Sequence, residues 1–150
     1  VDVPVRYAAV NQLQMTNDSG LRLSGITILV AEDNEINQLI LEENLTCEGA
    51  RLVLVSDGQQ AVEVIAAAAP DEFDLVLMDV MMPVLDGYQA TQQITTLRPG
   101  LPVIGQTAHA LGEEREACFS AGMIDHIAKP IDPEELVLLI LKHVRPASAH

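Results

Sequence analysis

Short apolar runs alternate with helix-like segments from Gly25 almost to the end of the chain, and this alternation constrains the fold most. The apolar runs are continuous, which is typical of strands buried on both faces of a sheet. They lie at residues 26–31, 51–55, 75–78, 102–106 and 125–128. Helices are expected at residues 35–47, 59–69, 88–97, 111–121 and 133–144. Five strands alternating with five helices predict a doubly wound α/β fold with a parallel sheet.

Residues that favour helix ends flank several of these segments. Asn34 and Asp132 are expected to cap the first and last helices, with Pro133 at the first position of the last one. Gly49 is expected to end the first helix, and Pro70 the second. The first-helix residues expected to face the core are Ile36, Leu39, Ile40 and Cys47.

The last helix is apolar on all sides. Its core-facing stripe is expected to contain Leu136, Leu139, Ile140 and Val144. A helix on one face of a sheet needs only one such stripe. The additional apolar residues therefore either belong to a partner surface or are buried more deeply, and they are Val137, Leu138 and Leu141.

The composition fits one globular domain with an aliphatic core. The chain has 150 residues, of which 49% are apolar and 3% aromatic. Its net charge of −14 disfavours contact with nucleic acid or anionic membranes, because phosphate contacts need clustered lysine and arginine. Cys47 and Cys118 lack metal-ligand spacing, so buried free thiols in a reducing cytoplasm are expected.

Residues 1–24 do not continue the alternation. Val1, Val3, Val5 and Tyr7 occur at the spacing of a half-exposed strand, and residues 11–20 are polar like a linker. We expect residues 1–24 to be a linker that includes the tail of a preceding domain. The main domain is expected at residues 25–145, with a flexible tail at 146–150. The absence of an initiator methionine, a signal peptide and a membrane-length apolar run predicts a fragment of a longer protein that is not itself inserted in a membrane.

Charged side chains follow three of the predicted strands. Glu32 and Asp33 follow the first, Asp79 follows the third, and Lys129 precedes Pro130 after the fifth. The carboxyl ends of parallel strands open onto one crevice, where three acids repel each other unless a cation lies among them. Hard oxygen ligands with a free face suit Mg²⁺ that shares its coordination with a phosphoryl group. The pattern predicts magnesium-dependent phosphoryl chemistry centred on an aspartate. Helix capping by the first two acids is the alternative, although it explains neither of the other residues.

These residues resemble the receiver domain of two-component response regulators across residues 25–144. The matching motifs are Glu32-Asp33-Asn34, Asp79-x-x-Met82-Pro83-x-x-x-Gly87, Thr107-Ala108 and Lys129-Pro130. Residues 32–38 and 122–132 further resemble receivers fused to hybrid sensor histidine kinases, and residues 2–5 are similar to the last strand of a kinase ATP-binding domain. The resemblance implies a flavodoxin-like sheet of strand order 2-1-3-4-5 and a place in a bacterial phosphorelay.

The resemblance implies that Asp79 accepts a phosphoryl group from a phosphohistidine on a kinase. Mg²⁺, which Mn²⁺ can replace, is then bound directly by Asp33, through water by Glu32, and by Asp79 together with the backbone carbonyl of Met81. A carboxylate oxygen can attack a phosphorus atom whose charge is neutralised by metal, which gives an acyl phosphate.

Thr107 and Lys129 are implied to bind the phosphoryl oxygens, and the small Ala108 leaves the phosphorus open to an in-line donor. The peptide bond between Lys129 and Pro130 is implied to be cis, which is uncommon even for proline. The alternatives are a threonine that favours the end of a strand and an ordinary surface lysine. Gly87 is expected to let the loop after the phosphoacceptor turn into its helix.

His126 departs from the family, which often has an aromatic switch residue three positions before the lysine. The imidazole is either part of the switch or a half-exposed strand residue. Met81 and His109 occupy positions that modulate phosphate loss in the family. A zinc site built from His109 and His126 would lack ligands, because two do not make a closed site.

The resemblance predicts a cytoplasmic signalling domain that catalyses only its own phosphorylation and dephosphorylation. Its parent is expected to be a histidine kinase, which can be anchored in the inner membrane. The expected partners are a histidine kinase domain, in the same or another chain, and a histidine phosphotransfer protein or domain, with no nucleic acid. The alternatives are a free-standing receiver, a pseudo-receiver that acts by contact alone, and an aspartate-nucleophile phosphohydrolase. The last class carries its nucleophile at the end of the first strand, where this chain has Glu32 and Asp33.

Overall fold

A computed structural model describes residues 6–8, 22–82, 84–108 and 112–144 of the chain. The expectations for residues 1–5, for most of the predicted linker, for His109 and for the tail at 146–150 lie outside these residues. The described helices include none that is long and apolar enough to cross a membrane.

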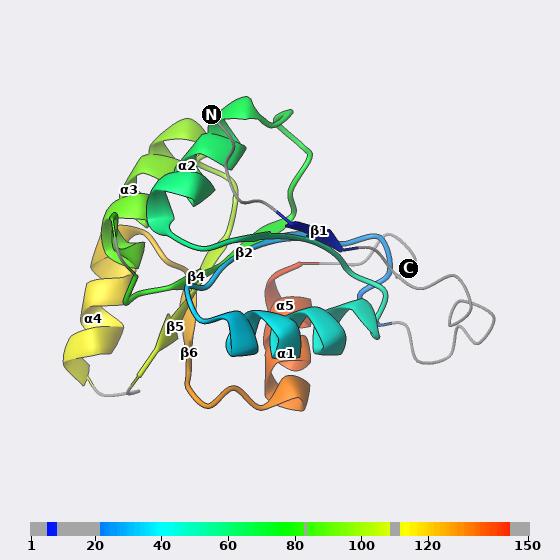
Figure 1. Ribbon diagram of the computed structural model, residues 1–150. Coiled ribbons are helices and arrows are strands. Elements are labelled where there is room, and N and C mark those ends of the chain that lie inside the picture. Colours follow the sequence, from blue (N-terminus) through cyan, green and yellow to red (C-terminus); the bar gives the residue numbers. More distant parts are fainter. Residues whose placement is uncertain (1–5, 9–21, 83, 109–111, 145–150) are drawn as a thin grey trace.

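The centre of the fold is a sheet of six strands in the order β1-β3-β2-β4-β5-β6 (Figure 1). Five of them are parallel and lie in the order β3-β2-β4-β5-β6. This is the predicted order 2-1-3-4-5, because β2 is the first strand that the sequence predicted for this sheet. These strands are β2 (Thr27–Ala31), β3 (Arg51–Val55), β4 (Leu75–Asp79), β5 (Val103–Thr107) and β6 (Asp125–Ala128). The flavodoxin-like prediction is confirmed.

The sixth strand, β1 (Arg6–Ala8), was not predicted to join this sheet. It pairs antiparallel with β3, and Arg6 lies opposite Leu54. Without β1, strand β3 would lie at the edge of the sheet, with backbone groups free to pair with another segment. The spacing in the sequence indicated a strand but not its partner. Its assignment to a preceding domain stays a prediction.

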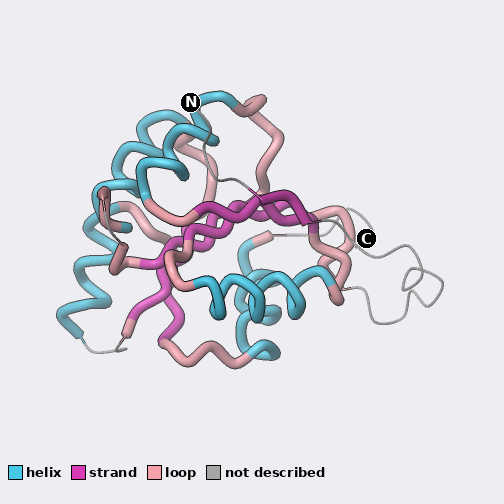
Figure 2. Tube along the Cα trace, viewed as in Figure 1, coloured by secondary structure: helices cyan, strands magenta, loops and turns pink. Residues whose placement is uncertain are grey.

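Helices cover both faces of the sheet, as Figures 1 and 2 show. Helices α1 (Glu35–Thr46) and α5 (Pro133–His143) lie on one face. Helices α2 (Gly58–Ala67), α3 (Gly87–Leu97) and α4 (Gly112–Ala121) lie on the other. Strand residues alternate between the two cores: Ile28 and Val30 contribute to the first, and Leu29 to the second. Two covered faces explain why the strands are apolar without a break.

Helix α1 turns a different face to the core from the one predicted. Its buried residues are Gln38, Leu41 and Leu45, whose spacing of three and four places them on one side. The residues that were predicted to be buried are instead exposed, and they are Ile36, Leu39, Ile40 and Cys47. The physical reason is Gln38, whose buried amide hydrogen-bonds to backbone carbonyls at the strand ends. Cys118 is buried, as predicted.

Helix α5 buries more of its surface than one stripe. Leu136, Val137 and Ile140 are buried, and Leu141 packs against the same core while half-buried. The helix contacts both the sheet and α1, which widens its buried face. Val137 is therefore excluded from the partner surface considered above, and Leu138 is the apolar residue of this helix that is mostly exposed.

The ordered domain begins before the predicted boundary at residue 25. Leu23 is fully buried in the core beneath α1 and α5. Arg22 binds Glu48, which follows α1, and Glu134 in the first turn of α5. Residues 22–24 thus belong to the fold, although the polar sequence before them indicated a linker.

Candidate functional site

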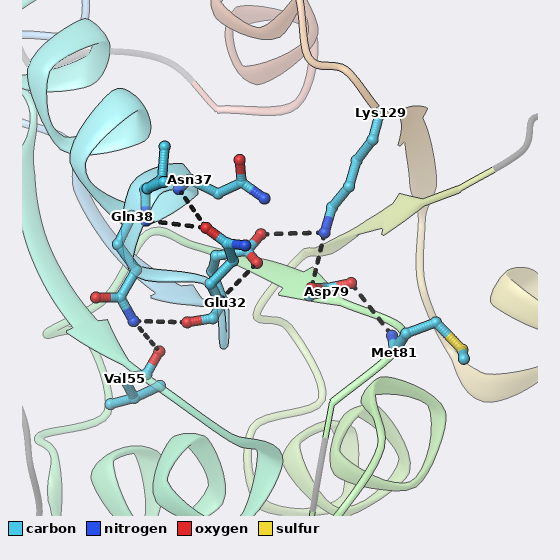
Figure 3. A network of polar contacts seen from close by, with 9 residues as sticks. Glu32, Asn37, Gln38, Val55, Asp79, Met81 and Lys129 are labelled. Atoms are coloured by element: carbon cyan, nitrogen blue, oxygen red, sulfur yellow. Dashed lines mark hydrogen bonds and ion pairs between the residues drawn. The ribbon is translucent and has the colours of Figure 1, made fainter.

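The structure brings together the three acids that the sequence placed at the strand ends. One carboxylate oxygen from each of Glu32, Asp33 and Asp79 lies within 4.8 Å of the others. Strands β2 and β4 are neighbours with Ala31 opposite Met78, so the residues that follow them meet at the same edge. Glu32 and Asp79 are buried, whereas Asp33 is exposed. Figure 3 shows the two buried carboxylates turned towards the ammonium of Lys129.

Glu32 belongs to this cluster and does not cap the helix. Asn34 caps α1, because its Oδ1 accepts the N–H groups of Ile36 and Asn37 at 2.9 and 3.1 Å. The Oε2 atom of Glu32 accepts the N–H of Asn34 at 3.1 Å. Burial raises the pKa of Glu32, and the negative charge of Asp79 raises it further. A buried acid of this kind is stabilised by a nearby cation.

Gln38 connects the ends of β2 and β3, and sequence reasoning gave it no role. Its Nε2 donates to the carbonyl oxygen of Glu32 at 2.5 Å and to that of Val55 at 3.3 Å (Figure 3). The side chain is buried at the start of α1. It therefore holds the backbone of Glu32 in place. The available signal was a glutamine in the first turns of a helix that follows a strand end, where its amide can reach backbone carbonyls.

Lys129 is the cation of the cluster. Its Nζ lies 2.8 Å from Oδ2 of Asp79 and 3.2 Å from Oε1 of Glu32. Burial alone would lower the pKa of Lys129, but the hydrogen bond with Asp79 and the charges of both acids outweigh it, so the pKa is raised. The ammonium stays charged at neutral pH. It is held by the acids and is not an ordinary surface lysine.

The donor set of this crevice fits a divalent cation. One ammonium faces three carboxylates, so the cluster keeps an excess of negative charge. All the candidate ligand atoms are hard carboxylate oxygens, and the exposed Asp33 gives the group an open side. Mg²⁺ prefers such oxygens and retains water at its free positions. Among the described residues, no other group of three or more potential metal ligands is found. His126 therefore belongs to no such group.

Thr107 ends β5 beside this crevice. Gln106 pairs with Asp79 across β4 and β5, so Thr107 lies one residue beyond the level of the aspartate. Its side chain is fully buried, and its Oγ1 makes no hydrogen bond with any described residue. A buried hydroxyl without a partner is available to bind an oxygen that arrives later. Its strand position is as predicted, but its role in binding phosphate stays a prediction.

The residues around the mouth of the crevice include Ala108 and Pro130. Ala108 is exposed directly after Thr107. The peptide bond between Lys129 and Pro130 is cis, the isomer that the resemblance implies. The N–H of Lys129 donates to the carbonyl oxygen of Thr107 at 2.7 Å, which joins β5 to the turn that carries the lysine.

The loop after Asp79 returns closely to the strand it leaves. Met81 donates its N–H to Oδ1 of Asp79 at 3.2 Å, and its side chain is mostly exposed. Gly87 has no positive φ, so the turn does not explain this glycine. A Cβ at position 87 would collide with the carbonyl oxygen of Asp79, so the glycine permits close approach. The carbonyl of Met81 as a metal ligand stays a prediction.

His126 lies on β6, away from the acids. Its ring packs edge-on against Phe119 of α4 with 6.2 Å between centroids. The imidazole is half-buried, and its Nδ1 has no hydrogen-bond partner among the described residues. Both interpretations of this residue, as part of a switch or as a strand residue, stay open.

Comparison with known proteins identifies the family. The family model described as the response regulator receiver domain matches residues 28–141. Sensor protein GacS of Pseudomonas syringae pv. syringae is 38% identical over 120 residues, which cover 77% of this chain and 13% of that protein. Sensor histidine kinase RcsC of Escherichia coli K12 is 38% identical over 121 residues, which cover 81% of this chain and 12% of that protein. The chain thus spans a small part of these relatives.

Solved structures share the fold, and one of them contains a metal ion. The receiver domain of sensor histidine kinase PA1611 from Pseudomonas aeruginosa PAO1 is 41% identical, with a TM-score of 0.72 over 80% of this chain and 98% of that one. That structure contains a magnesium ion coordinated in the active site cleft. The receiver domain of Ssk1 from Saccharomyces cerevisiae, crystallised with the histidine phosphotransfer protein Ypd1, is 26% identical, with a TM-score of 0.75 over 81% of this chain and 90% of that one.

Proposed function

The chain belongs to the response regulator receiver domain family, and from this premise we propose that Asp79 accepts a phosphoryl group from a phosphohistidine in a magnesium-dependent reaction. The observation that carries the proposal is the buried carboxylate of Asp79, which is held by Lys129 beside two further acids at one strand edge. A phosphohydrolase of the aspartate-nucleophile class would have its nucleophile at the end of β2, where Glu32 is instead hydrogen-bonded to Asn34.

The proposed step is a displacement at phosphorus. A bond forms between a carboxylate oxygen of Asp79 and phosphorus, and the bond from phosphorus to the histidine nitrogen breaks. The electron pair of that bond stays on the nitrogen, which takes up a proton from solvent. Lys129, which contacts Asp79, is proposed to stabilise the phosphoryl oxygens, and Thr107 to hydrogen-bond one of them through its buried, unpaired hydroxyl.

We assign Mg²⁺ to the acidic cluster. Asp33 and Asp79 are proposed to bind it directly, Glu32 through water, and Met81 through its backbone carbonyl. The 4.8 Å grouping of the carboxylates and the magnesium ion in the Pseudomonas aeruginosa relative support this assignment. Mn²⁺ can use the same ligands, because it also accepts carboxylate oxygens. When bound, the ion neutralises charge on the phosphoryl group.

The protein that carries the phosphohistidine is proposed to dock over the N-terminal half of α1. This helix starts next to the acids and exposes three large apolar side chains, namely Ile36, Leu39 and Ile40. A protein that brings its histidine to Asp79 must cover this face, because the helix borders the crevice. Exposed apolar side chains that cluster at one place are typical of such contacts. The complex between Ypd1 and the Ssk1 receiver domain supports a partner of the histidine phosphotransfer class.

We further propose that the chain is the receiver part of a hybrid sensor histidine kinase. The relatives GacS and RcsC support this context. The donor would be the kinase domain of the same or another chain, and the next acceptor a histidine phosphotransfer domain. The receiver itself would work in the cytoplasm, whether or not its parent is anchored in a membrane.

Intact-mass measurement of the phosphorylated protein tests the proposed function. The protein is incubated with Mg²⁺ and either acetyl phosphate or phosphoramidate, whose phosphorus–nitrogen bond resembles that of phosphohistidine. We expect one labile phosphoryl adduct in the wild type, no adduct in Asp79→Asn, and no adduct when EDTA removes the metal. A wild type that binds Mg²⁺ but takes up no phosphate would contradict the proposal and favour a pseudo-receiver.

A further inference from the structure

Gln106 is a buried polar residue that neither the fold nor the proposed reaction uses. It lies on β5 with no exposed surface, and neither atom of its side-chain amide hydrogen-bonds to any described residue. A buried amide without partners lowers stability, because it loses its hydrogen bonds to water and gains none in return. Such a residue in a folded protein needs a physical explanation.

Gln106 is the neighbour of Asp79 in the sheet. The two residues are paired across the parallel strands β4 and β5. Leu77 and Ile104, which precede them by two positions, both belong to the core beneath α1 and α5. Side chains two residues apart on a strand point to the same face, so Gln106 and Asp79 share that side of the sheet.

The same side of the sheet contains a cavity of about 460 Å³. It lies between α1 and the turn after β6, and Gln106 and Lys129 both line it, together with Asn37, Leu41 and Ala108. The cavity therefore connects the unpaired amide with the lysine of the acidic crevice.

Lys129 has hydrogen-bond donors that its present contacts do not use. A lysine ammonium carries three N–H donors, and one of them is used in the hydrogen bond to Oδ2 of Asp79 at 2.8 Å, whereas Oε1 of Glu32 at 3.2 Å is an ion-pair contact without a hydrogen bond. If the ammonium moves onto phosphoryl oxygens, its contacts with the two carboxylates change. The Oε1 atom of Gln106 is an unpaired acceptor, and Gln106 lines the same cavity.

We propose that Gln106 is a positioning residue for Lys129, whose ammonium it holds in the phosphoryl-binding position by accepting one N–H. This inference rests on the proposed function of Asp79. An uncharged amide suits the task, because it accepts a hydrogen bond without competing for the positive charge. A carboxylate at this place would add a fourth negative charge to the crevice and draw the ammonium away from the phosphate.

The test compares stability and phosphorylation in Gln106→Met, with Gln106→Leu as a second variant of similar size. Both variants remove the unpaired amide, so the melting temperature should rise, by about 2–4 °C. The rate of phosphorylation by acetyl phosphate with Mg²⁺ should nevertheless fall, by about tenfold, as expected for losing a hydrogen bond to a charged group. A more stable but slower protein would not result from a merely structural role.

Thr91→Val is the matched control. Thr91 lies on α3, is fully buried, and its Oγ1 also has no hydrogen-bond partner among the described residues. The control should raise the melting temperature in a similar way and leave the phosphorylation rate unchanged. A double variant tests whether Gln106 acts through Lys129. Adding Gln106→Met to Lys129→Met should not lower the phosphorylation rate below that of Lys129→Met alone.

The outcomes separate this inference from the function on which it rests. If the wild type is phosphorylated on Asp79 but Gln106→Met and Gln106→Leu keep its rate, the positioning role is wrong and the proposed function stands. An equal loss of rate in the presence and absence of Lys129 also overturns it, because Gln106 would then act by another route. If the wild type takes up no phosphate, the proposed function fails and the inference fails with it.

Discussion

The ammonium of Lys129 bridges Asp79 and Glu32, at 2.8 and 3.2 Å, so the lysine holds the carboxylates that a divalent ion would also need. We therefore expect Lys129→Met to have opposite effects on two measurements. Mg²⁺ should bind more tightly, by about tenfold, because a competing positive charge is gone. Phosphorylation by acetyl phosphate should be slower, because the phosphoryl oxygens lose their cation.

Isothermal titration with Mg²⁺ and intact-mass kinetics measure these two effects. Lys142→Met is the matched control, since Lys142 is mostly exposed and lies 3.8 Å from Asp125, which starts β6 at the opposite end from Lys129. The control should change neither quantity. Weaker or equal Mg²⁺ binding by Lys129→Met would contradict the expectation and show that the ammonium does not compete with the ion.

The amide of Gln38 is expected to hold Glu32 in its proposed metal-binding position. The variant Gln38→Met removes the Nε2 atom that donates to the carbonyl oxygen of Glu32 at 2.5 Å. This buried oxygen then lacks that hydrogen bond. The free energy of unfolding should fall by about 1–3 kcal/mol. Mg²⁺ affinity should fall several-fold, because the backbone that carries a proposed ligand is no longer fixed. Urea unfolding and titration with Mg²⁺ measure both, with Gln93→Met on the exposed surface of α3 as the control. Unchanged Mg²⁺ affinity would limit Gln38 to a role in stability.

The strands and their order could be predicted because their cause is local and repeated. Strands covered on both faces have continuous apolar sequences. In β4, for example, the four residues before Asp79 are all apolar. The helix caps Asn34 and Asp132 were also predictable, because short polar side chains satisfy free N–H groups wherever a helix starts. The acids at the strand ends met as expected, because parallel strands bring equivalent ends to one edge.

The face of α1 could not be predicted from hydrophobicity. Ile36 and Ile40 are apolar but exposed, and Gln38 is polar but buried, because its amide has backbone partners that only the folded sheet supplies. The place of β1 was equally hidden, since a strand pattern does not name the strand it pairs with. Gln106 was predicted as the end of a strand, and its unpaired amide becomes visible only beside Asp79.

Val84, in the loop after Asp79, has a backbone conformation that is unfavourable for its side chain. Its φ is 69°, in the left-handed region, and the side chain is 79% exposed, so packing does not compensate. In this region the Cβ of any L-residue lies close to the backbone, and branching at Cβ adds to the crowding. Val84→Asn should raise the free energy of unfolding by about 1 kcal/mol, since asparagine tolerates this conformation.

Thermal unfolding of Val84→Asn beside Val84→Thr tests the cause of this strain. Threonine is polar but remains β-branched, so it should give little or no gain. Equal stabilisation by both variants would assign the effect to the exposed apolar surface instead of the backbone. The phosphorylation rate should be measured in parallel, because the loop joins Asp79 to α3.

Arg22 is expected to make stability depend on pH through Glu48. The guanidinium lies 2.8 Å from Oε2 of Glu48 and 2.8 Å from Oε2 of Glu134, and the hydrogen bond to Arg22 lowers the pKa of Glu48 in the folded protein. The folded state therefore binds fewer protons, so this stabilisation is complete above the ordinary glutamate pKa of about 4.3 and is lost as the pH falls through the lowered value.

Urea unfolding of the wild type and of Arg22→Gln tests this expectation. The free energy of unfolding of the wild type should exceed that of the variant most at neutral pH, and the difference should shrink below about pH 4. The control Arg51→Gln removes an equal charge from an exposed residue that forms no ion pair with any other described residue, and it should show no such dependence. A difference that stays constant down to pH 3 would mean that Arg22 stabilises the fold by packing and not by pairing with Glu48.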